Sequence, residues 1–445
     1  MRLRPTLISP EYTRLWFGQA VSSVGDAVFS TTLVLWVATI LVEGRPWAPV
    51  AVSGVLLATG AAVLLVGPVA GVFVDRWDKR ATMLRTEVLR GVMVALLTAV
   101  ACLPTSALAV EVWLALVYVT VFALNAAARF FTPARFALVA DLVTGEADRA
   151  RAAGLAQATS QTAWIVGPPL AAPLLFTVGL QWALLFNALS YAVSFVAVRS
   201  VRVPASGGGP AGGSEGQQPA SGGLFGEFVA GLRFFARSRF LVALLVLAVI
   251  GQFGVGALNT LNVFFTTDNL HASARLFGYL GMAMGVGGIV GALCAGRVVQ
   301  WIGARRATWI GLLVSGALLV LYSRQTGFLG GVAFLFAFAI PLTVLNTAMA
   351  PLLVAAAPAA YRGRVVAVFY PVTQLASMLA AVLAGWLAGT VLRGLDVPLG
   401  PLRLGPVDTI LAVSGLFVVL SGVYAWLALP APESADAPEM AGVRV

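Results

Sequence analysis

The segment Gly71-Val-Phe-Val-Asp-Arg-Trp-Asp-Lys-Arg-Ala-Thr82 is a short charged break between two long apolar stretches. It is echoed later in the chain by Gly296-Arg-Val-Val-Gln-Trp-Ile-Gly-Ala-Arg-Arg-Ala-Thr308, which is one residue longer. A Leu-Asn pair at 124–125 is matched in the same way by the Leu-Asn pair at 345–346. The chain is therefore interpreted as two related halves in the same orientation.

The composition places both halves in a membrane. Apolar residues make up 60% of the chain and charged residues 10%, against about 45–50% and about 25% in soluble proteins. Water-soluble enzyme classes are excluded, because too little polar surface exists to cover their cores. A membrane-crossing helix needs roughly 20 apolar residues, and twelve stretches qualify: 14–41, 50–74, 82–103, 108–131, 152–178, 181–198, 240–266, 276–299, 307–323, 328–356, 365–392 and 408–429.

These stretches are too long and too evenly apolar for the strands of a membrane barrel, which alternate with a period of two. The sequence predicts an all-α integral membrane protein with twelve transmembrane helices in two pseudo-symmetric six-helix halves. If both termini are cytoplasmic, 22 of the 28 basic residues lie inside, 5 lie outside, and Arg90 lies within a span. Basic residues near span ends resist translocation, so we expect a multi-pass cell-membrane protein with both termini inside.

Composition also divides the chain into segments. The Gly/Ser/Pro-rich tract between the halves has no apolar periodicity and is typical of a disordered tether. Apolar residues at helical spacing follow it, with Arg233 and Arg237 among them, which indicates an interfacial amphipathic helix or simply the entry to the seventh span. The predicted units are a six-helix half (1–200), a cytoplasmic linker (201–223), the interfacial helix (224–239), a second half (240–430) and a disordered tail (431–445).

The break at 71–82 carries a recognisable signature. Gly71, Asp75, Arg76 and Arg80 fit the pattern G-x-x-x-D-R-x-x-x-R. With this signature the chain resembles the major facilitator superfamily over essentially its whole length. Segments 15–26, 131–135 and 165–168 resemble the drug:proton antiporter-3 type, which includes macrolide, multidrug and siderophore exporters. The resemblance implies export of a hydrophobic or amphiphilic small molecule by proton antiport, with a siderophore or lysolipid transporter as the alternative.

The signature loop is interpreted as a latch between the halves. Asp75 is suited to the N-terminus of the eleventh span, where unpaired backbone N–H groups favour an anion. Arg362 and Arg364 immediately precede that span. By resemblance, the latch stabilises the outward-open state. The other interpretation is a solvated loop whose positive charges only set orientation.

The fifth span contains Gly167 and Pro168, which resemble the antiporter motif of the family. Small residues allow close helix approach and prolines bend a helix, so a kinked packing helix is the competing interpretation. The chain departs from the family pattern at Ala171 and Ala172, where glycines are preferred. The arginine that many proton antiporters carry in span four is absent near Asn125, which puts the usual coupling route in doubt.

Charged residues inside the spans are candidates for proton coupling, because a carboxylate at mid-bilayer costs roughly 2.5–3.5 kcal/mol. Asp26 lies well inside the first span and is the proton-coupling candidate. It can alternatively pair with a neighbouring helix. Glu87 and Arg90 are three residues apart in span three and share a helix face, which favours a mutual ion pair.

Uncharged polar and aromatic residues along the spans are candidates for the substrate cavity: Asn125, Trp164, Asn259, Asn346, Tyr370 and Gln374. Hydrogen bonding between helices is the competing role for each of the polar residues. We expect no metal, cofactor or nucleic acid, and no enzyme activity, because no HExxH, GxSxG or GxxxxGK[ST] motif occurs. The expected partners are a small-molecule substrate, protons and the lipid bilayer, with the chain acting as a monomer. A third hypothesis is that the protein is a sensor that transports nothing, and only the family resemblance argues against it.

Overall fold

The structure is a computed structural model that describes residues 7–74, 76–202, 233, 235–356, 361–399 and 402–428. The first six long helices are α1 (Pro10–Trp36), α2 (Ala48–Val74), α3 (Lys79–Val100), α4 (Val110–Leu142), α5 (Glu146–Pro173) and α6 (Leu180–Ser200). The next six are α8 (Arg239–Phe264), α9 (Phe277–Ile302), α10 (Ala304–Ser323), α11 (Phe328–Ala355), α12 (Arg362–Trp386) and α13 (Pro406–Ala428). Between them lie the 3₁₀ turns η2 (Thr105–Ala107) and η5 (Ala274–Leu276), and an antiparallel hairpin of β1 (Val397–Leu399) and β2 (Leu402–Leu404).

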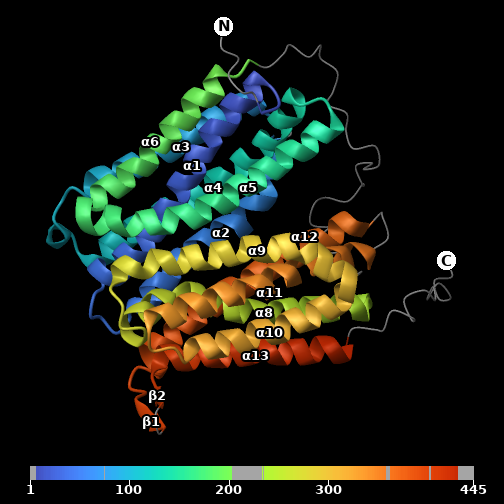
Figure 1. Ribbon diagram of the computed structural model, residues 1–445. Helices are drawn as coiled ribbons and strands as arrows, with labels where there is room; N and C mark the ends of the chain where they lie inside the picture. The colour runs from blue at the N-terminus through green and yellow to red at the C-terminus, as the bar shows by residue number, and fades with distance from the viewer. Residues whose placement is uncertain are drawn as a thin grey trace, which may run out of the picture.

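The two sets of helices pack in the same pattern. In the first set α1 contacts α5 and α6, α3 contacts α4 and α6, and α2 contacts α4. The second set repeats each pairing, with α8 against α12 and α13, α10 against α11 and α13, and α9 against α11. Between the sets, α5 packs on α9 and α2 packs on α12, so even these contacts are related by the repeat. The predicted fold of two pseudo-symmetric six-helix halves is confirmed (Figure 1).

The two ends of the bundle differ. We call the end that carries the β1–β2 hairpin the hairpin side, and the opposite end, where α1, α3, α8 and α12 begin, the arginine-rich side. The halves touch closely on the hairpin side: a Cβ added to Gly385 of α12 would lie 2.5 Å from the carbonyl oxygen of Pro49 in α2. Figure 1 shows the halves meeting toward the hairpin side and diverging toward the arginine-rich side.

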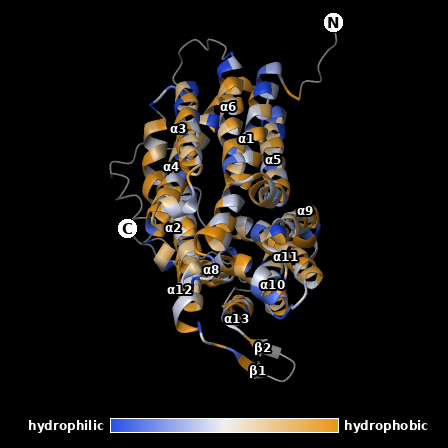
Figure 2. Cartoon of the chain, turned by 90° about the vertical axis from the view of Figure 1, so that its left-hand side faces the viewer, coloured by the Kyte–Doolittle hydropathy of each residue, from blue (hydrophilic) through white to orange (hydrophobic). Residues whose placement is uncertain are grey.

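The helices suit a bilayer. Ten of the described helices are long and apolar enough to cross a membrane. The other two, α3 and α5, have 22 and 28 residues but begin with charged turns at Lys79 and Glu146. Figure 2 shows apolar residues along most of the helix surfaces. Because lipid offers no hydrogen-bond partners, helices whose backbone groups bond internally are the structure that this environment permits.

Two helices extend beyond the predicted spans on the arginine-rich side. Helix α4 continues to Leu142, past the predicted end at residue 131, and α5 begins at Glu146 rather than at residue 152. Hydropathy reports which residues enter lipid, whereas a helix continues into water wherever propensity and packing support it. Buried contacts of Leu138 with the first half account for the longer α4.

Each half has its own core near the hairpin side. In the first half, Trp36 of α1 packs edge-on against Trp113 of α4, with ring centroids 5.5 Å apart. In the second half, Phe265 and Tyr322 pack with centroids 4.7 Å apart. All four side chains are buried. Each half therefore has an apolar core of its own.

Four of the described helices end in a π turn, all on the hairpin side: η1 (Val37–Leu41) after α1, η3 (Leu174–Val178) after α5, η4 (Phe265–Asn269) after α8 and η7 (Leu387–Val391) after α12. These are the first and fifth helices of each half. Every turn contains a threonine whose hydroxyl donates to the carbonyl four residues earlier: Thr39, Thr177, Thr267 and Thr390. The hydroxyl supplies a local donor where the backbone ladder changes from α to π spacing.

Candidate functional site

The central feature of the first half is an ion pair between Asp26 of α1 and Arg90 of α3. A guanidinium nitrogen of Arg90 lies 2.8 Å from Oδ2 of Asp26. The hydroxyl of Tyr191 in α6 donates to Oδ1 of Asp26 at 2.5 Å. The Asp26 side chain is 41% exposed, whereas that of Arg90 is only 8% exposed. A partly exposed carboxylate is thus paired with a buried cation.

Arg90 is stabilised by aromatic rings as well as by charge. Its guanidinium carbon lies 4.3 Å from the ring centroid of Tyr191 and 5.8 Å from that of Phe131 in α4. Such cation–π contacts favour a charged guanidinium in a site with little water. Arg90 is consequently fixed by helices α1, α4 and α6.

The predicted ion pair between Glu87 and Arg90 is wrong. Both lie on one face of α3, but Arg90 reaches across to Asp26 instead, and Glu87 makes no ion pair with any described residue. The spacing of residues in the sequence indicates only which side chains are neighbours on the same helix. The long arginine side chain can satisfy its charge on a different helix, and no same-helix pattern anticipates that choice.

More polar groups lie on either side of the ion pair along the same helices. The hydroxyl of Ser194 donates to Oε1 of Glu87 at 2.6 Å, and the amide of Gln19 donates to Ser194 at 2.8 Å. In the other direction, the amide of Asn187 lies 3.4 Å from the hydroxyl of Tyr191. All these groups except Asp26 are buried. Helices α1, α3 and α6 therefore share two neighbouring hydrogen-bonded clusters, one of Gln19, Ser194 and Glu87 and one of Arg90, Asp26, Tyr191 and Asn187, which together we call the polar network.

Sequence reasoning missed the contribution of α6. Its polar residues recur three and four positions apart at Asn187, Ser190, Tyr191 and Ser194. That spacing places them on one face of the helix. All four are buried. A polar stripe along an otherwise apolar span was the available signal, and it points at α1 and α3.

The signature residues lie on the arginine-rich side. Arg80 donates to the carbonyl oxygen of Val198 at 3.3 Å and also to that of Arg199, so it caps the end of α6. Its neighbour Lys79 pairs with Asp141 of α4 at 2.8 Å. Gly71 lies near the end of α2 and Arg76 is exposed in the turn that follows. The hydrogen bonds of Arg80 and the ion pair of Lys79 tie the signature turn to its own half.

The structure does not describe the residues that the proposed latch would bring together. Asp75 is not among the described residues, and neither are the side chains of Arg362 and Arg364 in the first turn of α12. The latch across the halves therefore stays a prediction.

The antiporter-like motif lies where α5 meets two other helices. A Cβ on Gly167 would lie 2.5 Å from the Cβ of Ala27 in α1, so only glycine allows this approach. On another face, Pro168 abuts α9, where a Cβ on Gly278 would lie 2.1 Å from the Pro168 carbonyl oxygen. The motif on α5 thus contacts α1, which carries Asp26, on one side and α9 of the opposite half on the other.

The predicted cavity residues are spread over five helices, α4, α5, α8, α11 and α12. Trp164 and Tyr370 are 53% and 59% exposed. Asn259 and Asn346 are also exposed, and Gln374 is half-buried. Asn125 donates to the carbonyl of Val121 in its own helix at 2.9 Å. The described contacts do not bring the six together through hydrogen bonds, so their shared role stays a prediction.

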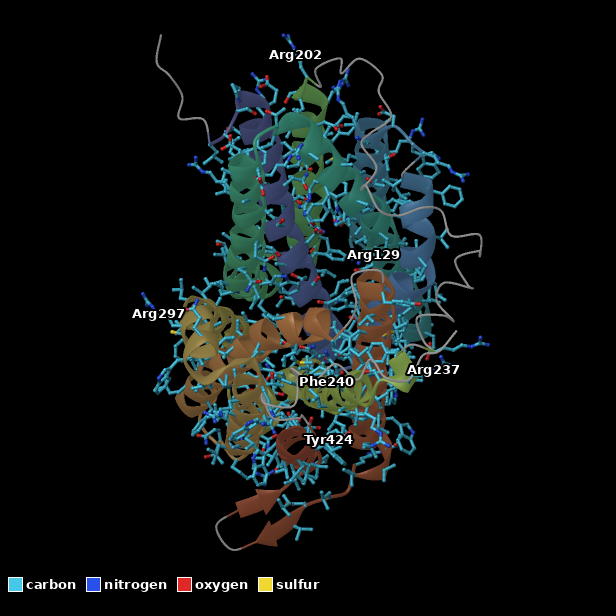
Figure 3. The ribbon with its side chains drawn as sticks, turned by 90° about the vertical axis from the view of Figure 1, so that its right-hand side faces the viewer. Arg129, Arg202, Arg237, Phe240, Arg297 and Tyr424 are labelled. Carbon is cyan, nitrogen blue, oxygen red and sulfur yellow. The ribbon has the colours of Figure 1, made fainter. Side chains whose placement is uncertain are left out.

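Helix α4 carries an arginine that sequence reasoning assigned to the cytoplasmic set. Arg129 lies one helical turn after Asn125 and is half-buried, and its Nε has no hydrogen-bond partner among the described residues. Figure 3, viewed from the arginine-rich side, labels Arg129 between the two halves, whereas Arg202, Arg237 and Arg297 lie at the rim. The predicted fourth span ends at residue 131, so Arg129 was counted at its inner end, whereas α4 continues to Leu142 and places Arg129 more than three turns before the helix end.

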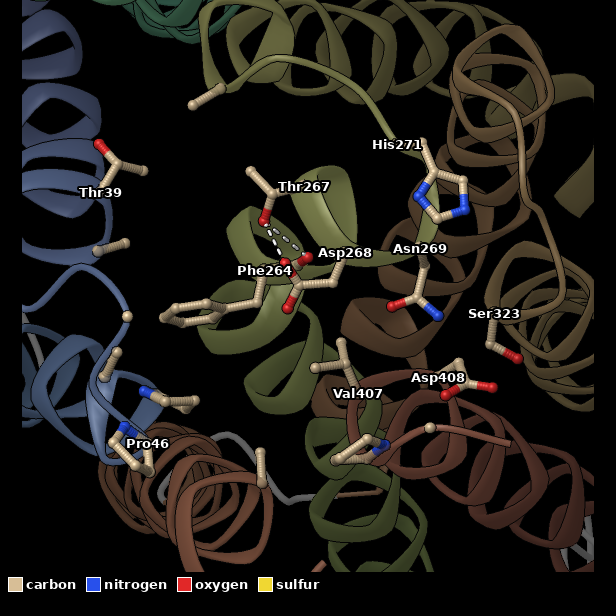
Figure 4. Close-up of a pocket in the computed structure, with 18 of the residues that line it drawn as sticks. Thr39, Pro46, Phe264, Thr267, Asp268, Asn269, His271, Ser323, Val407 and Asp408 are labelled. Carbon is tan, nitrogen blue, oxygen red and sulfur yellow. Dashed lines mark hydrogen bonds between the residues drawn. The ribbon is translucent and has the colours of Figure 1, made fainter. Parts of the chain in front are cut away.

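A cavity of about 1110 Å³ opens on the hairpin side. Both halves line it, and its charged residues are Glu43, Arg45, Asp268, Arg324, Asp396 and Asp408, with His271 beside them. Figure 4 shows Asp268 hydrogen-bonded to Thr267, with Asp408 near Ser323. Asp408 is buried and pairs with Arg324 at 3.1 Å. None of the predicted site residues line this cavity.

Potential metal ligands do not gather in the part of the chain that the structure describes, where no group of three His, Cys, Asp or Glu side chains could hold an ion.

Comparison with known proteins identifies the family of this chain. Residues 15–266 and 244–442 match the family model described as "Major Facilitator Superfamily". Macrolide efflux protein A of Streptococcus pyogenes is 22% identical over 286 residues, which is 64% of this chain and 66% of that protein. The match thus spans just under two thirds of the relative's length.

Solved structures share the fold. The nucleoside transporter NupG superposes with a TM-score of 0.74 at 11% identity, over 94% of this chain and 100% of that one. A bacterial homologue of the iron transporter ferroportin in an inward-facing state superposes with a TM-score of 0.70 at 12% identity, over 94% of this chain and 98% of that one. With the family model covering most of its length, the chain belongs to the Major Facilitator Superfamily of membrane transporters.

Proposed function

We propose that this protein exports a hydrophobic or amphiphilic small molecule, a drug or natural product, by proton antiport with alternating access. The observation that carries the proposal is the Asp26–Arg90 pair, in which a partly exposed carboxylate is balanced by a buried cation in one half of a transporter fold. A proton bound to Asp26 would cancel this attraction. The protein can therefore couple proton binding to rearrangement of α1 against α3.

Orientation follows from charge. The arginine-rich side is proposed to face the cytoplasm, with both termini on that side in the cell membrane. The halves touch on the hairpin side and diverge on the arginine-rich side. In this orientation the structure corresponds to an inward-open state, like the state named for the ferroportin homologue. The protein is proposed to work as a single chain, because each half closes its own core.

The latch belongs to the opposite state. We propose that Gly71, Asp75, Arg76 and Arg80 engage Arg362 and Arg364 when the arginine-rich side closes. Arg80 and Lys79 already hold the signature turn firmly on its own half. That anchoring leaves the turn poised to meet the first turn of α12 as a rigid unit.

The driving force is sufficient for export. One proton entering along the membrane potential gains roughly 2.3 kcal/mol per 100 mV. At equilibrium this sustains a substrate gradient of roughly fifty-fold for one-to-one exchange of a neutral substrate. No nucleotide site is needed for such a gradient.

The substrate class rests on two supports. The relative from Streptococcus pyogenes is named as a macrolide efflux protein. The candidate residues Trp164, Tyr370 and Asn259 combine exposed aromatic rings with few hydrogen-bonding groups, which suits amphiphiles better than sugars.

The test is uptake into inverted membrane vesicles with a panel of amphiphilic compounds that includes erythromycin. We expect uptake with an imposed proton gradient, its loss with a protonophore, and its loss in Asp26→Asn. Asp148→Asn, an exposed acid in the first turn of α5, is the matched control and should keep full uptake. Uptake of a lysolipid or siderophore instead of the drugs would assign the alternative substrate. Uptake that ignores the protonophore would refute proton antiport.

A further inference from the structure

The polar network contains a second carboxylate that the proposed mechanism does not yet use. Glu87 of α3 is 1% exposed. Its Oε1 accepts the hydroxyl of Ser194, and its Oε2 has no partner among the described residues. A buried polar atom left without a partner is uncommon in proteins.

The charges around Glu87 do not balance it. The charged groups that act on it are Arg90 of its own helix and Asp26 of α1. Arg90 gives its ion pair to Asp26. From α4, Arg129 acts on Arg90 and is not among the charged groups that act on Glu87, and from α6 the neutral Ser194 donates to Glu87. One cation thus serves two carboxyl groups, so both cannot be charged without leaving an uncompensated anion inside the membrane.

We infer that Glu87 is a second proton-binding residue, which holds a proton in this state, and that Arg90 is a counter-ion exchanged between Asp26 and Glu87. The inference rests on the proposed proton coupling at Asp26 and deepens it. Glu87 and Arg90 lie three residues apart on one face of α3. The buried Nε of Arg90 has no partner at present. A rotamer change of Arg90 is therefore enough to transfer the ion pair.

The exchange keeps the network neutral. Asp26 gains a proton from water between the halves and forms an O–H bond, which ends its attraction for Arg90. Arg90 then pairs with Glu87, whose O–H bond breaks and whose proton leaves toward Gln19 and the arginine-rich side. Before and after, the network holds one guanidinium, one carboxylate and one carboxylic acid. The two acids thereby share one proton, and their occupancy is opposite.

Isotope-edited infrared spectroscopy of the purified full-length protein tests this directly, without substrate or gradient. Glutamate is labelled with ¹³C at its carboxyl group, so that the C=O stretch of a protonated glutamic acid is separated from that of aspartic acid. At neutral pH we expect this band in the native protein and its loss in Glu87→Gln. Glu146→Gln, an exposed acid at the start of α5, should leave it unchanged.

Substitutions of Asp26 test more sharply whether the protonation of Glu87 depends on Asp26. In Asp26→Asn, Arg90 has no carboxylate except Glu87, so the band should fall at least twofold at the same pH. Asp26→Glu keeps a partner for Arg90 and should restore the band of Glu87, measured as the difference from the same variant carrying Glu87→Gln. Size-exclusion profiles confirm that each variant is folded.

Absence of the band in the native protein, or an unchanged band in Asp26→Asn, would overturn the inference. Either result leaves the vesicle assay for export unaffected. Conversely, a coupled band in a protein that exports nothing would reject the proposed function alone.

Discussion

Gly278 of α9 meets Pro168 of α5 so closely that a Cβ on the glycine would lie 2.1 Å from the proline carbonyl oxygen. The two residues belong to opposite halves. Pro168 lies within the antiporter-like motif of α5. Their contact shows that this motif forms part of the junction that keeps the hairpin side closed.

Gly278→Val should therefore open or destabilise the hairpin side. The obstructing atom is backbone, which cannot rotate away as a side chain could. We expect a large loss of transport in vesicles and increased labelling of a cysteine placed on that side by a membrane-impermeant thiol reagent. Gly296→Ala, at a glycine with open space around it, is the control and should keep both properties. Full transport by the valine variant would show that the junction can part freely.

A reversible cross-link can test whether the junction must open. A Cβ on Gly385 of α12 would lie 3.0 Å from the Cβ of Ser53 in α2, close to the separation of about 3.5–4.5 Å in disulfides. In a chain with Cys102 and Cys294 replaced by alanine, Ser53→Cys with Gly385→Cys should lose transport on oxidation. Reduction should restore transport to the level of the Gly385→Cys single variant, whose own Cβ would lie 2.5 Å from the Pro49 carbonyl oxygen, and oxidation should change transport by neither single variant. Unimpaired transport by the oxidised protein would contradict alternating access.

Ser194→Ala should destabilise the first half. The change removes the donor to the buried Oε1 of Glu87, which costs about 1–3 kcal/mol. We expect a lower Tm by fluorescence-detected size exclusion. Ser200→Ala, which removes an exposed hydroxyl from the end of the same helix, should leave the Tm unchanged. Equal Tm values for the two variants would mean that Glu87 finds another donor.

Asp408→Asn should weaken the second half. Asp408 is buried and pairs with Arg324, whose side chain is 20% exposed. Removing one partner of a buried ion pair costs about 3–5 kcal/mol, and the partial exposure of Arg324 favours the lower end. The thermal midpoint should fall, whereas Asp396→Asn, an exposed acid on the same cavity, should not change it. If stability depended on the negative charge of the cavity and not on the Asp408–Arg324 pair, both variants would lower the thermal midpoint equally.

The architecture was predictable because hydropathy, charge and repetition all act over long stretches of sequence. Twelve apolar segments and the echo of residues 71–82 at 296–308 indicate two helical halves without knowledge of any contact. The family signature adds the transporter fold. Asp26 was identifiable for a similar reason, since a lone acid inside a span is conspicuous.

The remaining errors and omissions concern side-chain partners and helix ends. Arg90 bonds to Asp26, which lies 64 residues away in sequence, so its choice over Glu87 depends on packing. The roles of Tyr191 and Ser194 likewise follow from which face α6 turns toward α1. Arg129 was counted with the cytoplasmic residues because it lies two residues before the predicted end of the fourth span at residue 131, whereas α4 continues to Leu142. The π turns depend on hydrogen-bond geometry that residue type alone does not determine.

Those π turns give the hairpin side a particular mechanical property. A π turn closes over one residue more than an α turn, and each residue of an α-helix advances the chain by about 1.5 Å and about 100°. Converting one of these turns to α spacing would shift and rotate the following loop by that step while the rest of the helix stayed intact. Four helix ends, matched between the two repeats, thus each contain one residue more per turn than α spacing needs. A change to α spacing would add that residue to the connecting loop and let the loop lengthen as the bundles separate.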